Sequence, residues 1–232
     1  MIELILIKIT VVENKNILKI EIWSDIQCPF CYIGKRKLEK AIEIFEGKEN
    51  LEIEWRSYQL DPDATSQPGV DMYDYLATRK GQTRDWSIAM HKNVTNMAKE
   101  NGLDYHFEKA LIANSYNAHR LIHLAKKYKL GNEAEETIFK AYFTEGKNIA
   151  DLKILTQLGK EIGLNEEELK DVLNSDKFGD DVRTDIEEAQ NIGVKGVPFF
   201  VFNRSHAVSG AQPVEIFTET LNKSFEGWKN KN

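Results

Sequence analysis

The two cysteines of this 232-residue chain form the segment Cys28-Pro29-Phe30-Cys31. Before this segment, residues 18–23 alternate apolar and polar side chains, which predicts a half-buried strand. After it, apolar residues recur every three or four positions, which predicts a helix that has Pro29 in its first turn. The cysteine pair is therefore expected at a strand-to-helix junction.

A cysteine at the start of a helix is chemically activated. Free backbone N–H groups and the positive end of the helix dipole stabilise a thiolate, which lowers the pKa of the first cysteine. The Cys28 thiolate can attack a disulfide, and the Cys31 thiol, one turn further on, can resolve the mixed disulfide. We therefore interpret Cys28 as the nucleophile and Cys31 as the resolving thiol of a redox pair.

Two other interpretations of the pair are weaker. A structural disulfide across so short a loop would constrain the unfolded chain little. A zinc site needs two more ligands, and the sequence has neither a second CxxC segment nor two histidines at ligand spacing, so we predict no metal. The net charge of −6 argues against nucleic acid or an anionic membrane as a partner.

The first twelve residues are rich in apolar side chains. Glu3 and Lys8 interrupt them, no basic segment precedes them and no small-residue cleavage site follows, which argues against a secretory signal. The stretch is also too short to span a bilayer. We interpret residues 1–17 as an extra strand or a loosely fixed extension and expect a cytoplasmic protein, in which a lone CxxC segment is more often catalytic than structural.

The order of the remaining predicted elements defines a fold. Strand patterns cover residues 18–23, 51–58, 198–202 and 206–209, and a terminal helix starts near Pro213. Between them, the predicted helices cover residues 71–80, 84–101, 107–129, 133–144, 152–162, 166–174 and 180–191. Without that middle region the order is β-α-β-β-β-α, which predicts an α/β thioredoxin fold with a large all-helical insertion. Its predicted parts are residues 1–62, the insertion 63–192, and residues 193–232.

A second segment is expected to complete the site. Gly193 and Gly196 precede Val197 and Pro198 at the start of the predicted strand over residues 198–202. Two glycines so close together indicate an unusual backbone conformation there. In thioredoxin folds the corresponding loop faces the CxxC segment and carries a cis bond before proline. We predict a cis Val197–Pro198 bond, which would leave the Val197 backbone free to pair with an extended substrate. A trans proline that opens the strand is the alternative.

Several further segments make the chain similar to a known family. They are Ser24–Lys35, Asn114–Leu121, Ala141–Ile149, Gly193–Val201 and Val208–Pro213. On these segments, over roughly residues 18 to 225, the chain resembles the DsbA-like thioredoxin family and, within it, the FrnE-type branch. The resemblance implies a thiol–disulfide oxidoreductase that acts on protein or small-thiol disulfides. It implies no cofactor beyond the redox-active cysteine pair, with glutathione or another low-molecular-weight thiol as a candidate co-substrate.

We expect Pro29, Phe30, Val197 and Pro198 to contact the substrate. Phe30 stands where the best-known periplasmic oxidants of the family have histidine. Because this substitution removes a cationic partner for the thiolate, it predicts a less oxidising couple.

Three polar residues outside the cysteine pair are candidates for supporting roles. Asp25 could relay the Cys31 proton if it is buried, or it could serve as a turn or cap residue. His119 could reach the active site, although a hydrogen-bonded structural role is favoured. Arg120 is expected to form an ion pair that fixes the insertion.

Two other functions remain open at this stage. A glutathione-dependent isomerase or transferase can share this fold and use a single Ser or Cys at the same helix N-terminus, but a resolving thiol would destroy its thiol adduct. A non-enzymatic binding module could instead change partner with the state of the disulfide.

Overall fold

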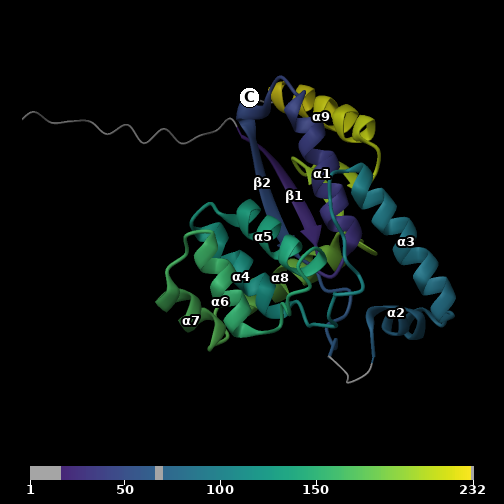
Figure 1. The fold of residues 1–232 in the computed structure, drawn as a ribbon. Helices are drawn as coiled ribbons and strands as arrows, with labels where there is room; N and C mark the ends of the chain where they lie inside the picture. The colour runs from purple at the N-terminus through teal and green to yellow at the C-terminus, as the bar shows by residue number, and fades with distance from the viewer. Residues whose placement is uncertain (1–16, 66–69, 231–232) are drawn as a thin grey trace, which may run out of the picture.

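A computed structural model describes residues 17–65 and 70–230 of the chain (Figure 1). Its strands are β1 (Leu18–Ser24), β2 (Leu51–Ser57), β3 (Phe199–Phe202) and β4 (His206–Ser209). Its helices are α1 (Pro29–Glu43), α2 (Met72–Lys80), α3 (Arg84–Glu100), α4 (Tyr116–Lys127), α5 (Gly131–Phe143), α6 (Leu152–Glu161), α7 (Glu166–Leu173), α8 (Gly179–Asn191) and α9 (Val214–Lys229), with a short 3-10 turn at Lys48–Asn50.

The described strands form one mixed sheet in the order β2-β1-β3-β4. β1 runs parallel to β2 and antiparallel to β3, and β3 and β4 form an antiparallel hairpin. In this register Trp23, near the end of β1, lies opposite Phe199, the first residue of β3. The pairing therefore brings the segment before β3 to the same end of the sheet as the segment after β1.

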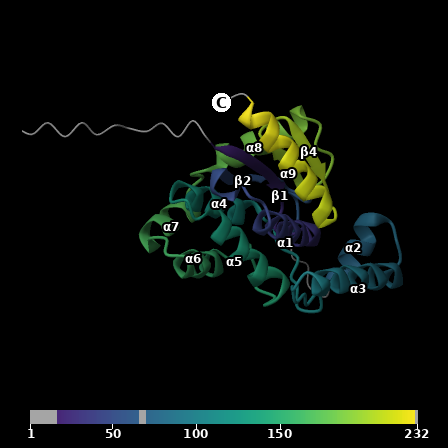
Figure 2. The same ribbon diagram turned by 90° about the horizontal axis from the view of Figure 1, so that it is seen from above.

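Alternating side chains of the central strands bury both faces of the sheet. On one face, Ile22 and Phe200 belong to the main core together with Leu38 of α1. On the other face, Trp23 and Val201 pack with α8 in a second cluster. The helices α1 and α9 pack against each other, and α8 packs against β2 (Figure 2). The sheet is thus a middle layer between helices, and this packing fixes the position of the end of β1.

Helices α2 to α8 all lie between β2 and β3 in the sequence. They divide into two groups, with α2 and α3 on one side of the molecule and α6 and α7 on the opposite side (Figures 1 and 2). The fold is an α/β thioredoxin-like fold with an inserted helical region, as the order of elements predicts. The boundaries at residues 62/63 and 192/193 stay predictions, and the interpretation of residues 1–17 concerns residues that, except for the last, lie outside the described part.

The predicted helix over residues 107–129 is wrong in its first third, because α4 begins only at Tyr116. The Asn114 side chain accepts a hydrogen bond from the Tyr116 N–H at 2.8 Å, and the His106 N–H donates to the Phe143 carbonyl at 2.7 Å. Phe107 is buried in a group of aromatic rings. This loop packs into the core, so its apolar residues recur at a spacing that resembles that of a helix.

Candidate active site

Cys28 and Cys31 lie at the junction of β1 and α1, as the sequence predicts. Cys28 is the N-cap of α1 in an extended conformation, and Pro29 is in the first turn, where a missing N–H costs least. The Cys28 N–H donates to the Asp25 carbonyl at 2.9 Å, and the Cys31 N–H donates to the Cys28 carbonyl at 3.0 Å. Both cysteines are free thiols and are only 3% and 1% exposed. The tight turn therefore holds two reduced, buried thiols one helical turn apart.

The segment before β3 completes this site from the far end of the chain. The Cys28 thiol donates to the Val197 carbonyl oxygen, with 3.4 Å between sulfur and oxygen. The Val197–Pro198 peptide bond is cis. A Cβ atom on Gly34 would lie 3.0 Å from Phe200 Cζ and 3.1 Å from Pro198 Cγ. Gly34 is therefore what lets α1 approach this segment closely.

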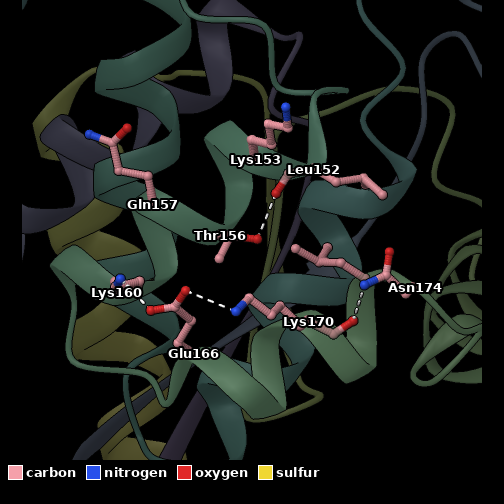
Figure 3. Close-up of a pocket in the computed structure, with 9 residues that line it drawn as sticks. Leu152, Lys153, Thr156, Gln157, Lys160, Glu166, Lys170 and Asn174 are labelled. Atoms are coloured by element: carbon pink, nitrogen blue, oxygen red, sulfur yellow. Dashed lines mark hydrogen bonds and ion pairs between the residues drawn. The ribbon is translucent and has the colours of Figure 1, made fainter.

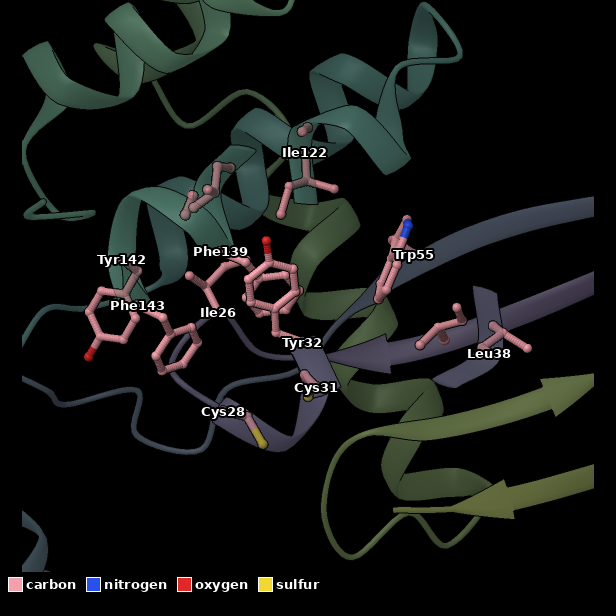
Figure 4. Packing of buried hydrophobic residues seen from close by; sticks show 14 of the residues in the cluster. Ile26, Cys28, Cys31, Tyr32, Leu38, Trp55, Ile122, Phe139, Tyr142 and Phe143 are labelled. Carbon is pink, nitrogen blue, oxygen red and sulfur yellow. The ribbon is translucent and has the colours of Figure 1, made fainter. Parts of the chain in front are cut away.

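The surroundings of Cys31 keep its thiol protonated. Burial raises the pKa of Cys31 well above its usual range, and the neighbouring Cys28 sulfur raises it further. The Asp25 backbone amide and the Ser24 hydroxyl lower the pKa of Cys31 and offset part of this shift. Figure 4 shows both cysteines beside aromatic side chains of the main hydrophobic core. Any reaction of Cys31 as a nucleophile therefore requires that its proton be taken away.

Asp25 is buried beneath the turn that carries the cysteines. One carboxylate oxygen accepts from the Leu60 N–H at 2.6 Å, and the other accepts from the Gln27 N–H at 3.2 Å. The second oxygen also lies 3.6 Å from the Nε2 atom of buried His119. This nitrogen has no hydrogen-bond partner in the described part of the chain. The carboxylate thus fixes the turn and faces an imidazole at the same time.

Tyr105 is a contributor that sequence reasoning missed. It comes from the loop between α3 and α4, is buried, and donates from its hydroxyl to the Pro29 carbonyl at 2.7 Å. Tyr32, on α1, stacks on Phe139 and donates to a Glu136 carboxylate oxygen at 2.6 Å, which ties α1 to α5. Tyr32 lies in the segment around the cysteines that carries the family resemblance, whereas no local pattern marks Tyr105 among the eight tyrosines of the sequence.

The predicted ion pair of Arg120 is absent from the described contacts. The guanidinium instead donates to the backbone carbonyls of Val172, Ser175 and Lys177 and to the Asn117 side chain. These carbonyls follow one another at the end of α7 and in the turn before α8. Arg120 therefore fixes the insertion as expected, but by satisfying carbonyl groups at the end of a helix rather than by binding a carboxylate.

A cavity of about 340 Å³ opens beside Cys28. Pro29, Phe30 and Val197 line it, whereas Pro198 lies outside the lining, buried against α1. Its other walls are mainly apolar and come from α2, α3, α5 and nearby loops. They include Met72, Tyr75, Leu76, Trp86, Met90, Val94, Phe107, Tyr142 and Phe143. Three of the four residues predicted to contact the substrate thus line the cavity beside Cys28.

A second hollow of about 470 Å³ lies between α6 and α7 and contains none of the predicted site residues (Figure 3). Three of its charged side chains are paired with one another, since both Lys160 and Lys170 bind Glu166. Within the described residues, no three His, Cys, Asp or Glu side chains gather as metal ligands, and no helix is long and apolar enough to cross a membrane.

A sheet end that carries a buried CxxC pair, faced by Val197, defines a thiol–disulfide oxidoreductase of the thioredoxin fold. The model of the DSBA-like thioredoxin domain matches residues 19–222. The chain belongs to this DsbA-like family, and it is a DsbA-like oxidoreductase with Cys28 and Cys31 as its CxxC pair.

Three known proteins illustrate how similar the chain is to others in sequence and in fold. A solved structure described as a probable DsbA oxidoreductase from Streptomyces coelicolor is 34% identical, with a TM-score of 0.85 and 90% of each chain covered. The uncharacterized protein YwbO of Bacillus subtilis is 29% identical over 206 residues, which cover 87% of this chain and 94% of YwbO. The cytosolic disulfide reductase DsbM of Pseudomonas aeruginosa, solved with GSH, is 15% identical, with a TM-score of 0.60 and 92% and 98% of the two chains covered, and it shows the same fold.

Proposed function

We propose that this protein exchanges disulfides with protein or small-thiol substrates in the cytoplasm, with Cys28 as the nucleophile and Cys31 as the resolving thiol. The observation that carries the proposal is the position of Cys28, which lies at a helix N-terminus, contacts the Val197 carbonyl and borders a cavity. The sequence segments quoted above also support a place in the FrnE-type branch of the family.

In the reducing direction, the Cys28 thiolate attacks one sulfur of the substrate disulfide. A Cys28–substrate disulfide forms, and the other substrate sulfur leaves as a thiolate that takes up a proton. Cys31 then loses its proton and attacks the Cys28 sulfur, which releases the second substrate thiol and leaves a Cys28–Cys31 disulfide. The substrate gains two electrons and two protons, and two equivalents of a thiol such as glutathione return the protein to the dithiol.

The Val197 carbonyl and Asp25 take supporting roles in this proposal. When Cys28 ionises, its thiol no longer donates to the Val197 carbonyl, which is then free to accept a hydrogen bond from the backbone of an extended substrate. Asp25 accepts the Cys31 proton and passes it toward His119, whose Nε2 lies 3.6 Å from the carboxylate. The raised pKa of Cys31 is the physical reason why such a base is needed.

An equilibrium titration of the purified protein in glutathione buffers, followed by thiol alkylation and mass measurement, tests the proposal. We expect a single two-electron transition between about −120 and −270 mV, whose position shows whether the couple oxidises or reduces in the cytoplasm. Cys31→Ser should trap the substrate on Cys28, and Cys28→Ser should abolish exchange.

One result would replace this function with another. If no intramolecular disulfide forms and a stable glutathione adduct accumulates on Cys28, the oxidoreductase mechanism fails. A glutathione-dependent isomerase or transferase would then be the better description. The resolving thiol one turn from Cys28 argues against that outcome, because it would attack any such adduct.

A further inference from the structure

Two polar side chains that line the cavity beside Cys28 each have a buried atom with no hydrogen-bond partner among the described residues. Gln27 precedes the nucleophile directly and lines the cavity, and its Nε2 atom is buried with no acceptor among the described residues. Tyr75, on α2, lines the same cavity, and its hydroxyl is likewise buried with no partner in the described part of the chain. The mechanism above uses neither side chain.

The wall that carries Tyr75 is held in place by other contacts. Arg79, one turn further along α2, lies with its guanidinium 5.7 Å from the Tyr75 ring centroid. The same guanidinium pairs with the buried Asp61 carboxylate and donates to the Leu60 carbonyl at 3.3 Å. Leu60 is also the residue whose N–H binds Asp25 beneath the cysteines. The α2 wall is therefore connected to the cysteine turn through one short segment.

Buried polar groups in folded proteins are nearly always hydrogen-bonded, so two unpartnered ones in one cavity call for an external partner. A carboxamide N–H is a donor, and a phenol hydroxyl can both donate and accept. A peptide group offers a carbonyl acceptor and an N–H donor within a few ångströms. The apolar remainder of the cavity suits the side chain of a residue next to that peptide group.

We propose that Gln27 and Tyr75 are positioning residues that hydrogen-bond the peptide groups beside the reactive cysteine of a peptide disulfide. The cavity would then select amide-bearing disulfides over amide-free ones by contacts additional to the one at Val197. This inference rests on the proposed function, because it assumes that Cys28 attacks a disulfide bound in this cavity.

Single-turnover kinetics of the reduced protein with two probes test the inference. One probe is the disulfide of acetyl-Leu-Cys-Leu-amide, and the other is bis(2-hydroxyethyl) disulfide, which has no amide. In Gln27→Leu and in Tyr75→Phe, we expect the half-saturating concentration of the peptide probe to rise roughly three- to tenfold with little change in its limiting rate. The ratio of the second-order rate constants, peptide over hydroxyethyl probe, should fall by the same factor.

A matched control is Tyr73→Phe, which removes a hydroxyl from the same helix at a residue outside the cavity lining and should keep the wild-type ratio. An unchanged ratio in both test variants would overturn the inference, because neither polar atom would then contact the peptide probe. An equal loss with both probes would also overturn it, since the residues would then support the cysteine turn itself. If the wild-type protein reacts with neither probe, the proposed function fails instead.

Discussion

Cys31 must lose a proton before it can resolve a mixed disulfide, and its surroundings oppose that loss. Burial raises the pKa of its thiol, so the thiolate fraction near neutral pH is small. Asp25 is the carboxylate nearest in sequence to the pair, is buried, and is fixed by two backbone N–H groups. The proposed mechanism therefore assigns the removal of this proton to Asp25, which is buried beneath the cysteines.

Asp25→Asn should therefore slow the resolving step. Asparagine keeps the size of the side chain and one oxygen acceptor but cannot take a proton from Cys31. We expect resolution at pH 7 to slow by roughly 10²-fold, the lower end of the range for general-base catalysis, so that the mixed disulfide on Cys28 accumulates. Because the pKa of Cys31 is raised, the variant should recover as pH rises, by about tenfold per unit.

Acid quenching followed by mass measurement of the mixed disulfide gives the resolution rate. Asp63→Asn, an exposed carboxylate on the loop after β2, serves as the control and should resolve at the wild-type rate. A wild-type rate in Asp25→Asn at pH 7 would show that Asp25 only caps the turn, which is the alternative role.

How far the site could be predicted depends on where its residues lie along the chain. Cys28, Cys31 and Asp25 share one strand-to-helix junction, whose local pattern is sufficient to place them. Tyr105 and Tyr75 reach the site from the helical insertion, and their positions depend on how α2 and α3 dock. Contacts between distant segments leave no periodic trace in a single sequence, so neither tyrosine could have been selected.

At the scale of elements, the contact between α1 and the start of β3 determines the distance between the two halves of the site. Gly34→Ala should weaken this contact. In an open helix the change would stabilise by up to about 1 kcal/mol, but here the new Cβ would meet buried Phe200 at 3.0 Å. Overpacking typically costs about 1–3 kcal/mol, so we expect a net loss of roughly 1 kcal/mol and slower attack by Cys28.

Urea denaturation and the rate with bis(2-hydroxyethyl) disulfide measure the two effects. Gly227→Ala is the matched control, because Gly227 lies in helix α9 and a Cβ there meets nothing within 4 Å. That variant should be as stable as the wild type or more stable. If Gly34→Ala is stabilised like the control, the close approach of α1 to β3 is not a constraint.

The same scale shows where sequence patterns mislead. The spacing of apolar residues predicted most helices of the insertion, because each buries one face against its neighbours. It failed at residues 107–115, where Phe107 is buried in the core although it lies in a loop. The helix α4 begins only at Tyr116, whose N–H donates to the Asn114 side chain. A periodic pattern reports burial, and burial does not require a helix.

For the whole molecule, the pH dependence of stability follows from two neighbouring carboxylates on α5 whose surroundings shift their pKa values in opposite directions. Burial alone would raise the pKa of Glu136, but hydrogen bonds from Arg36, Lys35 and the Tyr32 hydroxyl outweigh it and lower this pKa to about 2. Glu135 is fully buried, one of its oxygens has no partner among the described residues, and burial raises its pKa to about 8. Glu136 thus contributes stability that is lost only in acid, whereas Glu135 contributes most while it is protonated.

Glu135→Gln should remove the second effect. Between about pH 4.5 and pH 8 the native state holds a proton that the unfolded chain releases, so the free energy of unfolding falls as pH rises. Glutamine resembles the protonated acid, so the variant should match the wild type near pH 4.5 and exceed it by a few kcal/mol near pH 8, on the order of 1.4 kcal/mol per pKa unit. Glu133→Gln, exposed on the same helix, should follow the wild type in urea titrations. Parallel curves for Glu135→Gln and the wild type would mean that Glu135 is ionised inside the folded protein with a partner that neutralises it.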